Sequence, residues 1–104
     1  MPCANDVHQD HQVISTEAVR AFKEVTLLGY EIPWNQLESN ANAFIVIEEK
    51  HLEQKWSSLA QYKSQLKLQR PYFSREYIRS LAKVRGLQIN ADWAEAFQVL
   101  RMRI

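Results

Sequence analysis

The sequence predicts an all-α fold, a small bundle of about four helices around one long central helix over residues 42–70. Two glycines and three prolines among 104 residues are too few for the tight turns of an all-β domain. Apolar side chains recur every seven residues in the central stretch, at Ile45, Leu52, Leu59 and Leu66. This period is typical of one apolar stripe on a continuous helix. A helix of ~40 Å exceeds the width of a compact domain, so part of its stripe would also suit a homodimer.

The first part of the chain predicts a tail and a first helix. Residues 1–13 are polar and are expected to form a disordered, flexible tail, which leaves residues 14–104 as a single helical domain. A first helix should begin at Ser15 and end at Gly29, a residue that favours the left-handed conformation after a helix. Pro33 can open a short helical turn, because its missing N–H costs nothing at the first helical position.

The second half of the chain predicts two further helices. One begins after the cap residue Ser74 and ends at Gly86. The other begins after Asn90 and buries Trp93 and Phe97.

Residues 43–47 carry an open alternative. Their run Ala-Phe-Ile-Val-Ile is apolar on all sides and is also typical of a short buried strand. No partner strand is obvious elsewhere, and a lone strand cannot satisfy its backbone, so we expect helix here.

The charges of the chain are unevenly distributed, although the net charge is only +1. Nine acidic and four basic side chains lie in residues 1–60, against three acidic and nine basic ones in residues 61–104. Basic residues with aromatics between them suit a phosphate backbone and unstacked bases. The predicted nucleic-acid-binding surface comprises Lys63, Lys67, Arg70, Tyr72, Arg75, Arg79, Lys83 and Arg85. The spacing of Arg75, Arg79 and Lys83 places them on one solvent-facing stripe; the alternative is a solvated face without a ligand.

A helix-turn-helix motif is one form that this binding could take. Ala82 and Gly86 are four residues apart, and a capped helix is expected after Asn90, as in that motif. Asp92 and Glu95 count against it, because they would face phosphates.

A protein-binding adaptor or inhibitor is the alternative function. Its polarised charge would steer it toward an acidic protein partner. Tyr30 and Trp34 lie in a connection rich in large apolar side chains and would anchor that partner, although plugging the core is the more ordinary role for them.

No group of residues predicts catalysis. The chain has only Gly29 and Gly86, so it lacks a glycine-rich phosphate loop. Cys3, His8 and His11 are metal-ligating types, but a mobile tail does not preform a metal site, so neither a metal nor a cofactor is predicted. One cysteine fits a reducing cytosol, and no apolar window is long enough for a membrane span. We therefore expect a non-catalytic, cytoplasmic regulatory or accessory protein.

Overall fold

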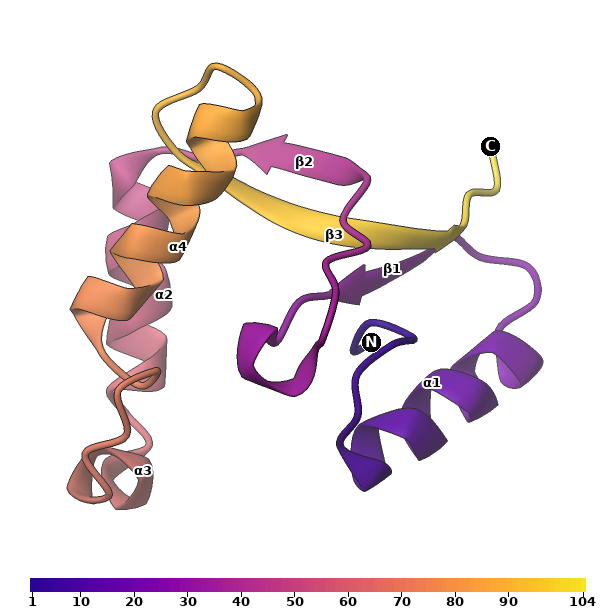
Figure 1. Ribbon diagram of the computed structural model, residues 1–104, viewed down its shortest axis with the longest axis horizontal. Helices are drawn as coiled ribbons and strands as arrows, with labels where there is room; N and C mark the ends of the chain where they lie inside the picture. The colour runs from indigo at the N-terminus through magenta and orange to yellow at the C-terminus, as the bar shows by residue number, and fades with distance from the viewer. The chain divides into compact units, whose positions relative to one another are not determined.

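The computed structural model describes residues 1–104 and has a mixed α/β fold (Figure 1). Helix accounts for 44% and strand for 16% of the chain, and the strands form a three-stranded antiparallel sheet, so the all-α prediction is wrong. The elements, in chain order, are α1 (Gln9–Ala21), β1 (Leu27–Tyr30), the 3-10 helix η1 (Pro33–Asn35), β2 (Ala43–Val46), α2 (Glu49–Leu59), α3 (Lys63–Lys67), α4 (Arg75–Gln88) and β3 (Ala94–Arg101).

Two compact units make up the chain. Unit 1 consists of residues 1–44 and 96–104, and unit 2 consists of residues 45–95. Unit 2 is therefore an insertion in the sequence of unit 1.

The strand order in the sheet is β1-β3-β2, so the last strand of the sequence is the middle one. β1 pairs with β3 in antiparallel register, with Leu28 opposite Val99 and a bulge beside Leu27. The predicted fourth helix is wrong, because Asn90 takes a left-handed conformation (φ 60°) and the chain then becomes extended. Ala94 and Ala96 are buried at alternate positions of β3, the two-residue period of a strand.

Residues 1–8 have a defined conformation, residues 1–3 pair with β1 and residues 9–13 belong to α1, so the prediction of a disordered tail is also wrong. The Cys3 N–H donates to the Tyr30 carbonyl (3.0 Å), and the Tyr30 N–H donates to the Met1 carbonyl (2.8 Å). An added Cβ at Gly29 would lie 2.9 Å from the Cys3 Cα. Gly29 therefore permits this close approach within β1, whereas we expected it to end the first helix, which in fact ends at Ala21.

A buried carboxylate fixes the chain where it enters α1. Asp6 is 1% exposed, and its Oδ1 accepts the backbone N–H of His8 at 2.8 Å. Its Oδ2 lies 2.9 Å from Nδ1 of His11 in the first turns of α1. These bonds give residues 6–11 a defined conformation.

The predicted helix 42–70 is divided into β2, α2 and α3. The alternative of a short strand at residues 43–47 is confirmed for Ala43–Val46, because β3 supplies the partner that the sequence did not reveal, but the strand is not buried as expected, since Ile45 and Val46 are exposed. Glu48 then starts α2 through a capping box with His51, in which each side chain bonds the other's backbone N–H. The apolar heptad spacing therefore does not follow one helix.

The core of unit 2 lies where α2 meets α4, and Figure 1 shows these helices side by side with α3 at the end where they connect. Leu52, Ile78 and Ala82 are buried, with Ile47, Trp56, Leu59 and Trp93 packed around them. The predicted cap is confirmed, since the Ser74 hydroxyl accepts the Tyr77 N–H at 3.1 Å. Likewise, Pro33 opens the short helical turn η1 as predicted.

Candidate functional site

The basic residues of α4 face acidic residues of α2. Arg79 lies 2.7 Å from a carboxylate oxygen of Glu49 and 3.5 Å from one of Glu53, and Arg75 lies 3.1 Å from the other Glu53 oxygen. Glu49 and Glu53 are four residues apart on α2, as are Arg75 and Arg79 on α4. Each pair therefore lies on one face of its helix, and the two faces meet. Arg79 is half-buried within these ion pairs, so the predicted solvent-facing stripe does not hold for it, whereas Arg75 is exposed as predicted.

Two cations of α4, Arg79 and Lys83, lie over the ring of Trp93. The Arg79 guanidinium lies 4.8 Å from the centre of the Trp93 ring, and the Lys83 ammonium lies 5.4 Å from it. Cations at this distance over an indole face are attracted by its quadrupole. Arg85, two residues after Lys83, donates to the Gln88 side chain at 3.0 Å. The predicted residues on α4 thus take part in contacts within unit 2.

The remaining predicted cations lie on and just after α3. Lys63 and Lys67 are one helical turn apart on α3, and Arg70 follows it; all three are exposed. None of them lies within ion-pair distance of a carboxylate, whereas Arg75 and Arg79 do. We call residues 62–70 the basic α3 segment, because they contain these three cations and no acidic residue.

One tyrosine begins this segment and another follows it, and the two differ in exposure. Tyr62, directly before α3, has 62% of its surface exposed. Tyr72, the predicted aromatic contact, is half-buried just before α4. The sequence interpretation missed Tyr62, because it assigned residues 42–70 to one long helix. The polar run Gln61-Tyr62-Lys63, between the end of α2 and the start of α3, is the signal that could have identified it.

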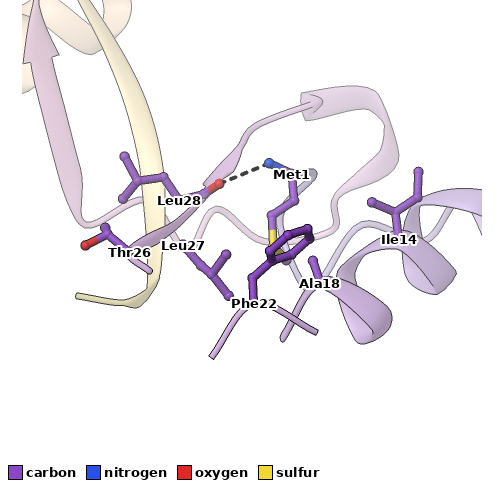
Figure 2. A pocket seen from close by; sticks show the side chains of 7 residues that line it. All are labelled: Met1, Ile14, Ala18, Phe22, Thr26, Leu27 and Leu28. Atoms are coloured by element: carbon purple, nitrogen blue, oxygen red, sulfur yellow. Dashed lines mark hydrogen bonds between the residues drawn. The ribbon is translucent and has the colours of Figure 1, made fainter. Parts of the chain in front are cut away.

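An apolar cleft of ≈ 600 Å³ opens in unit 1 (Figure 2). Ile14, Ala18 and Phe22 line it from α1 and its C-terminal cap, and Leu27 and Leu28 line it from β1. Met1 and Thr26 complete the lining. Phe22 is 58% exposed although its ring is fully apolar. No residue of this cleft was a predicted binding residue.

The predicted partner-binding residues Tyr30 and Trp34 also lie in unit 1. Tyr30 belongs to β1, and Trp34 belongs to η1. Each keeps roughly half of its surface exposed, so neither is sealed in a core. Their role in binding stays a prediction.

The metal-ligating types near the N-terminus are engaged in the fold. The Cys3 thiol is buried and donates to the Gly29 carbonyl at 3.3 Å, and burial raises the pKa of this thiol. The Nδ1 of His8 accepts the Asp10 N–H, while Nδ1 of His11 faces Asp6. No group of three or more His, Cys, Asp or Glu side chains in the chain could hold a metal ion.

The helix-turn-helix alternative is wrong, because the strand β3 occupies the place of the recognition helix. None of the helices is both long enough and apolar enough to cross a membrane. No protein-family model matches the chain, and no curated protein or solved structure matches it either. A function must therefore be argued from the residues and contacts described above.

Proposed function

We propose that this protein is a non-catalytic accessory or regulatory protein of the cytoplasm that binds nucleic acid through the basic α3 segment. The observation that supports this function is that Lys63, Lys67 and Arg70 are exposed, close in sequence and without a carboxylate partner. Like charges four residues apart destabilise a helix by ~0.2–0.5 kcal/mol. A bound phosphate would remove this repulsion, and the counterions released from the polyanion would favour the complex.

The ion pairs between α2 and α4 narrow the proposed surface. A phosphate that bound Arg75 or Arg79 would have to compete with Glu53 and Glu49, which already neutralise these guanidiniums. Lys83 has its ammonium over the Trp93 ring. The proposed phosphate contacts are therefore those of the basic α3 segment and not those of the α4 cations.

Fluorescence anisotropy with labelled oligonucleotides at several salt concentrations tests this function. The triple variant Lys63→Gln, Lys67→Gln, Arg70→Gln should weaken binding to all sequences. It should also flatten the slope of log affinity against log salt by ~0.7–0.9 for each lost phosphate contact.

The matched control removes the same number of charges elsewhere, by Arg20→Gln, Lys23→Gln and Lys50→Gln. These residues are exposed and lie outside the basic α3 segment. Both triple variants carry the same net charge, so equal losses of affinity would show that only net charge matters and would contradict the proposed site. If the unaltered chain binds no oligonucleotide even at low salt, the function itself is wrong.

A second candidate function is that of an adaptor or inhibitor that binds a protein, and the apolar cleft of unit 1 favours it. Exposed apolar patches on small proteins often mark interaction sites. The cleft contains no charged side chain, so an apolar face of an amphipathic helix is the kind of partner segment that it fits.

Selection from a peptide library would test this second function. Peptides retained by the unaltered chain should be lost by Phe22→Glu, because that change places a charge in the cleft. Leu87→Glu, at an exposed apolar position of α4, is the control and should retain them. Retention of the same peptides by Phe22→Glu would exclude the cleft as their site.

A further inference from the structure

Tyr62 differs from the other aromatic side chains near the basic α3 segment. Phe73 packs edge-on against Trp56, with ring centroids 6.3 Å apart and an interplanar angle of 61°. Trp56 in turn packs against the core of unit 2, and Tyr72 is half-buried. Tyr62 as a residue is 62% exposed, and it begins the segment that carries the three unpaired cations, so it is the aromatic residue here that is open to a ligand.

The backbone holds Tyr62 firmly although its ring is exposed. Its N–H donates to the Leu59 carbonyl at 3.0 Å, which continues the turn after α2. Its carbonyl accepts the N–H groups of Gln65 and Leu66 at 3.0 and 3.2 Å, which starts α3. The Cα position is therefore fixed relative to Lys63, and little ordering of the backbone is needed before a planar ligand can lie on the ring.

The geometry of α3 suits a single strand better than a duplex. A five-residue helix is only ~7.5 Å long, little more than one turn, which is too short to lie along the major groove of a duplex as a recognition helix does. Lys63 and Lys67 end in point charges on flexible stems, so they can follow phosphates whose spacing varies. Proteins that bind single strands combine such cations with aromatic side chains on which bases stack.

We propose that the ligand of the basic α3 segment is single-stranded nucleic acid, with one base stacked on Tyr62 and the adjoining phosphates on Lys63, Lys67 and Arg70. This inference rests on the proposed nucleic-acid function and adds the class of ligand and the residue that contacts a base. The ring supplies stacking, which tolerates any base, and the cations supply the salt-dependent attraction.

The experiment compares a labelled single-stranded oligonucleotide with a hairpin duplex of the same length, by anisotropy over a range of salt. The single strand should bind more tightly. Tyr62→Ala should lower its affinity by roughly five- to 150-fold, the loss that corresponds to one stacked base. The salt slope should stay unchanged, because no phosphate contact is removed. Tyr62→Phe should keep the affinity, since the ring remains.

Tyr30→Ala is the matched control and should keep the affinity, because it removes an exposed tyrosine that belongs to unit 1 and not to the basic α3 segment. Tyr62→Leu is the second variant: it keeps an apolar side chain at the site without a π face, and it should lose affinity as Tyr62→Ala does. Unchanged single-strand affinity in Tyr62→Ala and Tyr62→Leu, or equal or tighter binding of the duplex, would overturn the inference while the nucleic-acid function stands. Absence of binding to either oligonucleotide would overturn both.

Discussion

Replacing Gly86 with alanine should destabilise the protein, although the same exchange inside an exposed helix usually stabilises it by ~1 kcal/mol. An alanine Cβ at this position would lie 2.7 Å from the Ala91 carbonyl oxygen and 2.9 Å from the Asp92 carbonyl carbon. Both are backbone atoms, so the clash is relieved only if the turn that contains the left-handed Asn90 moves. Overpacking of this kind costs ~1–3 kcal/mol, which exceeds the gain in helix propensity, and we expect a net loss of up to about 2 kcal/mol.

Urea unfolding followed by circular dichroism would measure this change in the free energy of unfolding. Ser80→Ala is the control, because Ser80 is an exposed residue of the same helix. It should be neutral or stabilise by up to about 0.5 kcal/mol, from helix propensity alone. If Gly86→Ala also stabilises, residues 91–92 do not pack against α4. The sequence-based fourth helix after Asn90 would then have to be considered again.

Three further changes test other parts of the fold. Leu52→Ala should cost ~2–5 kcal/mol in urea unfolding, because Leu52 is 2% exposed at the centre of unit 2; a loss under about half a kcal/mol would mean that the core is elsewhere. Asp6→Ala should lower the thermal midpoint of unfolding, because the His8 N–H and the His11 ring lose their buried acceptor at a cost of ~1–3 kcal/mol. An unchanged midpoint would show that residues 1–8 are not anchored. Burial raises the pKa of the Cys3 thiol, so the stability linked to it is present below the ordinary thiol pKa and is lost as pH rises through the folded pKa. The alkaline fall in unfolding free energy should therefore be smaller in Cys3→Ala, and equal pH curves for the two proteins would contradict this.

Local signals in the sequence predicted the features that depend on neighbouring residues. Ser74 caps α4 by accepting the N–H of Tyr77, three residues further on, and Pro33 opens a helical turn because its ring fixes the backbone there. Such features need no distant partner. Local signals also predicted the helix that starts at residue 75, but it continues to Gln88 and does not end at Gly86. Gly86 is needed for another reason: the backbone of Ala91 and Asp92 lies too close for a Cβ at this position.

The strands were missed because their cause is distant in sequence. Gly29 resembles a helix end, and only its proximity to Cys3 explains it. Ala94 and Ala96 alternate toward the core, but alanine favours helix and gives a weak strand pattern. The partners of β1 and β2 lie in β3, which the local periodicity of either strand cannot indicate.

The candidate site was predicted in part. The sequence analysis missed the ion pairs between α2 and α4, although the spacing of the charges indicates them. Glu49 and Glu53 are four residues apart, as are Arg75 and Arg79, and this equal spacing of opposite signs is typical of two antiparallel helices in contact. A single helix over residues 42–70 left no such partner for α4, so its arginines were assigned to solvent. The structure separates the predicted surface into paired cations on α4 and unpaired ones at residues 63–70.

The position of β3 in the sheet determines the order in which the chain can fold during synthesis. Unit 2 is continuous in sequence, whereas residues 1–44 need residues 96–104 to complete their unit. The part that is synthesised first is therefore completed last, and closing its ends costs more entropy than closing a hairpin. Until β3 emerges, the apolar segment Ala43–Val46 has no strand to pair with, and Leu27–Tyr30 has only residues 1–3 beside it. In that interval they are open to pairing with the same segments of a neighbouring nascent chain.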